Sequence, residues 1–152
     1  VHTNDAATAY TRLLDLGVQE YLLNAALLSV LAQRLVRRLC SCAELKSKAD
    51  IASLVEQYDL AALAMQYGVN DLALKDARGC EQCGHTGFRG RVAILEYLPC
   101  NDEIKQLPKG DTFFMEVAQY MKRNNLRTLK QDGFLKVIKG QTTLEEVLRV
   151  AG

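Results

Sequence analysis

Four of the five cysteines in this 152-residue chain stand in two close pairs. The first pair is Cys-x-Cys at residues 40–42 and the second is Cys-x-x-Cys at residues 80–83. Four thiolates can bind zinc tetrahedrally, and each short-range pair supplies two ligands at a small loop-closure cost. Because alternate residues of an extended strand share a face, both cysteines of the first pair could reach one metal ion. The spacing therefore predicts one zinc site with four ligands: Cys40, Cys42, Cys80 and Cys83.

The same cysteines are open to other interpretations. A thioredoxin-like redox pair at Cys80 and Cys83 would open a helix, which the following Gly84-His85-Thr86-Gly87 does not favour. Unpaired thiols are a further alternative, because free cysteine is often simply part of a hydrophobic core. Disulfides are not expected, since the sequence shows no export signal.

Two neighbouring residues are weaker candidates for the metal site. His85 follows Cys83 by two residues and could replace one thiolate, although a histidine in a glycine-rich turn more often lies at the surface. Cys100 directly follows Pro99 and is expected to be a bystander rather than a ligand.

The sequence predicts some of the elements that would position the cysteines more clearly than others. Residues 78–90 (RGCEQCGHTGFRG) hold four glycines, which is typical of tight turns with positive φ. Arg91 to Leu98 then has the composition of a strand, ended by Pro99. Val30 to Leu39 fits a helix or a strand, because neither face of the segment is cleanly apolar.

Most of the remaining chain has helical patterns. Asn4 or Asp5 can cap the first helix, and Gly17 can end it. Thr143 and Glu146 match a capping box, in which each side chain bonds the other residue's backbone N–H. The other helices are expected at residues 19–27, 49–57, 60–67, 111–122 and 126–139.

Composition excludes several classes of function. Nineteen basic and eighteen acidic residues leave a net charge of +1, so no bulk positive field favours nucleic acid. The longest apolar run, Tyr21 to Ala32, is interrupted by polar residues and too short to cross a bilayer. The chain contains no phosphate loop of the Gly-x-x-x-x-Gly-Lys-Ser/Thr type. The residues present therefore predict a zinc-stabilised domain without a complete active site.

Several segments, in order along the chain, resemble the secretion ATPases of type II secretion and type IV pilus assembly. They are residues 2–4 (HTN), 11–17 (TRLLDLG), 31–40 (LAQRLVRRLC), 79–91 (GCEQCGHTGFRGR) and 143–150 (TLEEVLRV). The glycine-rich segment is similar to the second half of that family's four-cysteine zinc motif. The first pair departs from the family, which has Cys-x-x-Cys where this chain has the shorter Cys40-Ser41-Cys42.

The resemblance implies an α/β protein, α+β in this fragment, that forms the last part of a RecA-like ATPase. Residues 1–39 would belong to the RecA-like core, 40–90 to a zinc-binding insertion, 91–99 to a returning core strand and 100–152 to a C-terminal helical subdomain. It also implies that residues 30–39 form a strand antiparallel to residues 91–98, with the zinc module inserted at the tip of this hairpin.

The resemblance further implies a cytoplasmic hexameric motor that powers type II secretion or type IV pilus assembly. ATP and magnesium would bind the full-length protein, and His2 would match the His-box residue near the nucleotide's terminal phosphate. Expected partners are other copies of the chain and inner-membrane platform proteins, which would hold the motor at that membrane, and no nucleic acid. The fragment alone would be inactive; the alternative is a non-enzymatic zinc-binding protein-interaction module.

Overall fold

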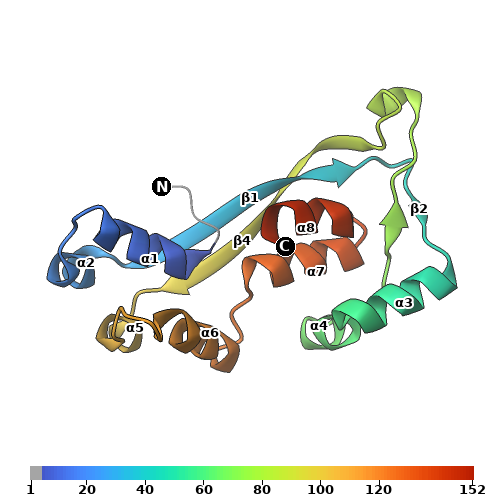
Figure 1. Cartoon of the computed structure of the whole chain (residues 1–152). Coiled ribbons are helices and arrows are strands. Elements are labelled where there is room, and N and C mark those ends of the chain that lie inside the picture. Colours follow the sequence, from blue (N-terminus) through green and yellow to red (C-terminus); the bar gives the residue numbers. More distant parts are fainter. Residues whose placement is uncertain (1–4) are drawn as a thin grey trace. The chain divides into compact units, whose positions relative to one another are not determined.

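The computed structural model describes residues 5–152, and it mixes helices and strands as the α+β class predicts (Figure 1). The helices are α1 (Ala6–Asp15), α2 (Glu20–Ala26), α3 (Lys48–Tyr58), α4 (Leu60–Gln66), α5 (Asp102–Gln106), α6 (Phe113–Arg123), α7 (Leu129–Ile138) and α8 (Leu144–Ala151), with a 3-10 helix η1 (Glu81–Cys83). The strands are β1 (Ser29–Leu39), β2 (Glu44–Leu45), β3 (Lys75–Asp76) and β4 (Phe88–Pro99).

The chain forms two compact units. The first contains the described residues up to Gln33 together with Leu95–Leu129, and the second contains Arg34–Ile94 with Lys130–Gly152. Strand β1 pairs with β4, and β2 pairs with β3. The long strands β1 and β4 therefore each contribute to both units.

Residues 30–39, which fitted either a helix or a strand, form strand β1 (Figure 1). The arrows of β1 and β4 run in opposite directions, which confirms the antiparallel hairpin. Backbone bonds close both ends, from Cys40 N–H to the Gly87 carbonyl (3.0 Å) and from Cys100 N–H to the Leu28 carbonyl (2.9 Å). The pairing partner decides the conformation here, because the sequence pattern of the segment alone is ambiguous.

The first unit has a core formed by α1, α2, α6 and the end of β4. Asp5, one of the two residues predicted to cap α1, accepts a hydrogen bond from the Thr8 N–H at 2.7 Å. The fully buried Tyr10 ring lies 5.6 Å from that of Phe113. The buried core residues are Ala6, Ala7, Tyr10, Leu23, Leu98, Cys100, Ile104, Phe113, Val117, Tyr120 and Met121.

Glu96 in β4 is a buried carboxylate in the first unit that joins two helix starts. Its two oxygens accept the N–H of Ala6 (2.7 Å) and the N–H of Leu129 (2.8 Å). Burial raises the pKa of Glu96, although both backbone bonds favour its charged form. The residue thus ties the first turn of α1 and the start of α7 to the same strand.

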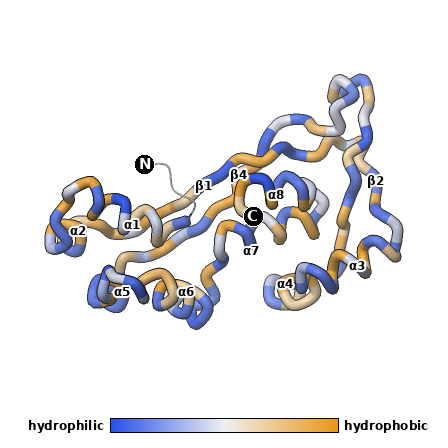
Figure 2. Tube along the Cα trace, viewed as in Figure 1, coloured by the Kyte–Doolittle hydropathy of each residue, from blue (hydrophilic) through white to orange (hydrophobic). Residues whose placement is uncertain are grey.

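The second unit has a separate core formed by α4, α7 and α8. The two C-terminal helices approach closely at Gly133, where a Cβ atom would lie 2.5 Å from the Val147 side chain. Figure 2 shows apolar segments in α4 and along β1 and β4. The buried core residues are Leu60, Leu63, Ala64, Leu74, Phe134, Leu135, Val137, Ile138, Leu144 and Val147.

The predicted capping box of the last helix is half formed. Thr143 accepts the Glu146 N–H at 3.3 Å, as expected. The Glu146 carboxylate does not reach back, because it binds Arg37 and Arg149 instead. No helix among residues 5–152 is both long enough and apolar enough to span a bilayer.

Candidate metal centre

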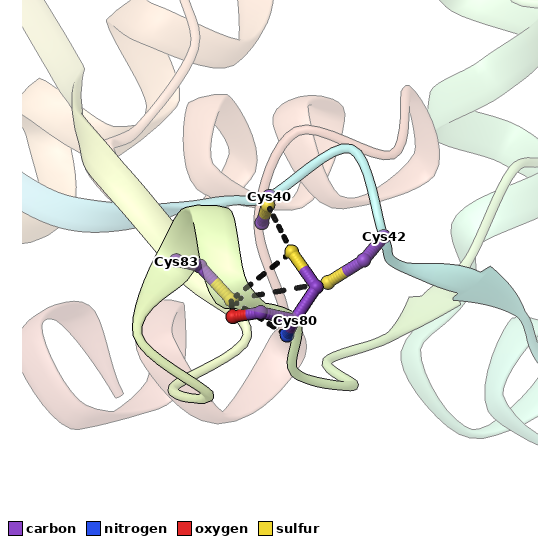
Figure 3. Close-up of side chains that lie close together, drawn as sticks. All are labelled: Cys40, Cys42, Cys80 and Cys83. Atoms are coloured by element: carbon purple, nitrogen blue, oxygen red, sulfur yellow. Dashed lines mark hydrogen bonds between the residues drawn. The ribbon is translucent and has the colours of Figure 1, made fainter.

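The four sulfur atoms of the cysteine cluster (Cys40, Cys42, Cys80 and Cys83) lie within 4.8 Å of one another (Figure 3). Neighbouring sulfurs are 3.8 Å apart between Cys40 and Cys80, and 4.0 Å apart between Cys42 and Cys83. Zinc–sulfur bonds of about 2.3 Å in a tetrahedron would separate the sulfurs by about 3.8 Å. The cluster thus has nearly the size of a zinc tetrathiolate, and the donor set fits the metal. This is the only such ligand group within residues 5–152.

The first pair sits in a turn and not in an extended strand, so this part of the prediction was wrong. Strand β1 ends at Leu39, and the Ala43 N–H donates to the Cys40 carbonyl at 3.0 Å. Because this i to i+3 bond closes a β-turn, Cys40 takes its first position and Cys42 its third. The turn brings both thiols to the cluster with a single residue between them, so the shorter spacing suffices.

The second pair is held by backbone N–H groups that point at sulfur. The Cys83 sulfur lies 3.2 Å from the Cys80 nitrogen and 3.2 Å from the Gly87 nitrogen. Cys83 ends η1, and Gly84 follows at φ +63°, the left-handed conformation that glycine adopts without strain. Hydrogen bonds of this kind orient the ligand and stabilise its thiolate.

Gly87 also occupies a place with no room for a side chain. Its φ is +84°, and a Cβ atom there would lie 2.8 Å from the Ala77 Cβ. Gly87 thus supplies a donor to Cys83 through its N–H and, through its carbonyl, an acceptor to Cys40. The glycine density of the segment indicated tight turns, but only the structure shows which glycine contacts the cluster.

The pKa values of the thiols diverge within the cluster. Burial raises the pKa of Cys42 to about 12, with the neighbouring thiols acting in the same direction. Burial also acts on Cys83, but N–H groups of Cys80 and Gly87 outweigh it and lower its pKa to about 6. The pKa of Cys40 is lowered chiefly by a hydrogen bond from the backbone of Cys42. Any metal that binds all four must therefore displace protons as it binds.

The other candidate residues do not belong to this ligand group. His85 is exposed at φ +63°. Cys100 is buried in the core of the first unit. His2, the expected His-box residue, lies outside the described residues.

Short strands and ion pairs support the module that carries the cluster. Strands β2 and β3 pair antiparallel, with Glu44 opposite Asp76 and Leu45 opposite Lys75. Lys46 Nζ lies 2.5 Å from an Asp76 carboxylate oxygen. Strand β2 closely follows the first cysteine pair and β3 closely precedes the second, so their pairing holds the two cysteine pairs together independently of a metal.

A family model described as "Type II/IV secretion system protein" matches residues 1–149. The chain belongs to this family. The secretion ATPase resemblance drawn from its motifs is therefore confirmed.

Named relatives come from both branches of the type II/IV secretion system family. The type IV pilus assembly ATPase PilB of Thermus thermophilus is 40% identical over 148 residues, which cover 97% of this chain and 16% of the relative. The type II secretion system protein E of Pseudomonas aeruginosa is 39% identical over 150 residues, which cover 99% of this chain and 28% of the relative. The type IV pilus assembly ATPase TfpB of Acinetobacter baylyi is 39% identical over 150 residues, which cover 99% of this chain and 25% of the relative. The chain thus spans only 16–28% of the length of these relatives.

Proposed function

We propose that this chain is the metal-stabilised C-terminal part of a motor ATPase that powers type II secretion or type IV pilus assembly. The observation that carries the proposal is the four-cysteine cluster at the end of the β1–β4 hairpin, within a chain that belongs to the secretion family. Cys40, Cys42, Cys80 and Cys83 would hold one zinc ion. Bound zinc would supply structural cross-linking and no reaction step.

The role of the metal follows from the two long segments that it would join. Cys40 directly follows β1, and the second pair precedes β4. A metal held by both pairs would close the loop of residues 43–79 and offset its closure entropy. The paired strands would thus keep a fixed spacing where the inserted module begins and ends.

The motor activity belongs to the longer protein. This chain contains no phosphate loop, so it has no cradle for the phosphates of a nucleotide. In the proposal, ATP and magnesium bind upstream residues, His2 lies near the terminal phosphate, and six copies assemble in the cytoplasm. Inner-membrane platform proteins then hold the ring at the membrane. Support comes from relatives named as pilus assembly ATPases and secretion system proteins.

Nucleotide binding by two lengths of protein tests this proposal. The isolated 152-residue chain is expected to show no magnesium-dependent ATP binding or hydrolysis. A longer product of the same gene with an upstream phosphate loop should hydrolyse ATP. Tight ATP binding by the isolated chain would contradict the proposal. A gene product that starts at Val1 would favour the alternative, a non-enzymatic zinc-binding interaction module.

A further inference from the structure

A pocket of about 490 Å³ lies in the second unit, lined by residues of β1, of the segment from β3 onward, of β4 and of α8 with its cap. No cysteine is among the described residues that line it. Its volume falls in the range of sites for small molecules. The charged lining residues are Arg37, Arg78, Arg149, Asp76, Glu145 and Glu146.

Two arginines share a single carboxylate in this pocket. The side chain of Glu146 is only 2% exposed. Its carboxylate accepts hydrogen bonds from Nε (3.1 Å) and Nη2 (2.5 Å) of Arg149. It also binds Nε of Arg37 and accepts the Arg37 backbone N–H at 3.2 Å. Two positive charges thus face the single negative charge of Glu146.

The guanidinium groups of Arg37 and Arg149 are held in place, and each keeps N–H donors that no described residue accepts. The Arg37 guanidinium carbon lies 4.1 Å from the centre of the Phe88 ring, which fixes its plane. Of the five N–H groups of each guanidinium, the described residues accept one from Arg37 and two from Arg149. Both side chains are more than half exposed, so the remaining donors are accessible to a ligand.

Of the surrounding charges in the pocket lining, the carboxylate of Glu145 offsets this positive surplus. Asp76 is bound to Lys46 at 2.5 Å, and Arg78 donates to Glu44 at 3.0 Å, so each pair is neutral. Glu145 is exposed and has no ion-pair partner within residues 5–152. It stands in the first turn of α8, where backbone N–H groups lack intrahelical partners and favour an anion. Removal of its charge should therefore strengthen any anion site here.

We propose that this pocket binds a phosphate group, carried by inorganic phosphate or by a phosphorylated small molecule. Oriented guanidinium groups match phosphate oxygens with paired N–H donors, and a helix start adds further donors. The pocket shares no residue with the cysteine cluster and does not require a phosphate loop. It would be an additional ligand site of this chain.

A titration of the zinc-loaded chain with inorganic phosphate, at constant ionic strength, tests the proposal. Nuclear magnetic resonance should show saturable shifts of the Arg37 and Arg149 Nε–H signals and of the backbone amides of 144–145. Arg78→Gln is expected to weaken binding about fivefold, because it removes a charged donor at an exposed position. The matched control is Arg123→Gln in the first unit, an equally exposed arginine paired with Glu103, which should leave binding unchanged.

A second variant guards against effects on folding. Glu145→Gln should tighten phosphate binding, an opposite change that a destabilised protein would not produce. Glycerol 3-phosphate serves as the second probe: tighter binding than inorganic phosphate assigns the site to phosphorylated small molecules, and equal binding assigns it to free phosphate. Non-saturable shifts with both probes, or equal weakening by Arg123→Gln, would overturn the proposal.

Discussion

At the scale of single residues, the cysteine cluster combines four thiols with unequal surroundings. Cys83 accepts two backbone N–H groups, whereas burial raises the pKa of Cys42. The sequence could predict the four ligands because both pairs are local patterns. It could not predict the donors to Cys83, because Gly87 contacts it only after the glycine-rich turns have formed.

Replacement of one ligand should remove the metal. Cys83→Ser is expected to lower the zinc content from about one ion per chain to near zero, because three thiolates hold zinc less strongly than four. Cys100→Ala is the matched control, since that thiol lies in the core of the first unit and should leave the zinc content unchanged. Elemental analysis of both purified variants measures the difference. Full zinc retention by Cys83→Ser would contradict the assigned ligand set.

Limited proteolysis should then locate the damage in Cys83→Ser. The second-unit core joins α4 of the inserted module to α7 and α8, so these helices should be cleaved together with the module. The first-unit helices α1 and α6 pack in a separate core and should resist cleavage. Equal cleavage of both units would show that the metal does not act locally.

Glu146 is a buried residue whose importance the sequence did not reveal. The capping pattern indicated a role for it at the start of α8, but one of its two arginine partners, Arg37, is 109 residues away in the sequence. Burial pushes the pKa of Glu146 upward, yet hydrogen bonds from Arg149 and Arg37 outweigh burial and lower it. A carboxylate whose pKa is lowered by folding stabilises the fold only while it is ionised.

Glu146→Gln should therefore destabilise the protein in a pH-dependent way. At neutral pH the expected loss in the free energy of unfolding is about 1–2 kcal/mol, since both arginine partners are largely exposed. The Glu146 contribution is present above the unfolded pKa of about 4.3 and disappears as pH falls through the lower folded pKa. Urea unfolding of both proteins at several pH values should show the difference shrinking in acid. A difference that grows below pH 4 would contradict the assignment.

At the scale of elements, the β1–β4 hairpin shows where local sequence patterns no longer suffice to predict secondary structure. Most helices could be predicted from caps and apolar spacing, as with Asp5 before α1 and Gly17 after it. Strand β1 could not, because its pattern is ambiguous until β4 pairs with it. The turn at Cys40 was missed for a similar reason, since a Cys-x-Cys spacing fits a strand and a β-turn equally.

The start of β4 should depend on Gly87, which precedes the strand, more than on Gly90 within it. Ala in the left-handed region costs about 1–2 kcal/mol at either Gly87 or Gly90. Gly87→Ala adds a clash with Ala77 and disturbs the donor to Cys83, whereas the Gly90 position is open. Gly87→Ala is thus expected to lower both thermal stability and zinc content, and Gly90→Ala only the first, to a smaller extent. Equal zinc content in the two variants would argue against this role of Gly87.

At the scale of the whole molecule, the first unit exposes several large apolar side chains. Leu16, directly after α1, is 61% exposed. The exposed apolar residues of this unit include Tyr21, Leu22, Leu28, Leu31 and Tyr97. Exposed apolar side chains of this size favour association.

The isolated chain is therefore expected to self-associate weakly. Light scattering over a range of concentrations should show a mass that rises reversibly from monomer towards dimer. Leu28→Ser combined with Leu31→Ser should reduce the rise, and Met65→Ser, an exposed apolar residue of α4, should not. A strictly monomeric chain at high concentration, or a stable hexamer of this chain alone, would contradict the expectation.

The central claim is that the four cysteines form one zinc centre, and the metal's own ligand shell tests it most directly. X-ray absorption at the zinc edge, on the chain purified with about one zinc, should show four sulfur neighbours at about 2.3 Å. A shell of three sulfurs and one nitrogen would indicate a histidine in place of one thiolate. That result, or a chain that binds no zinc, would contradict the account.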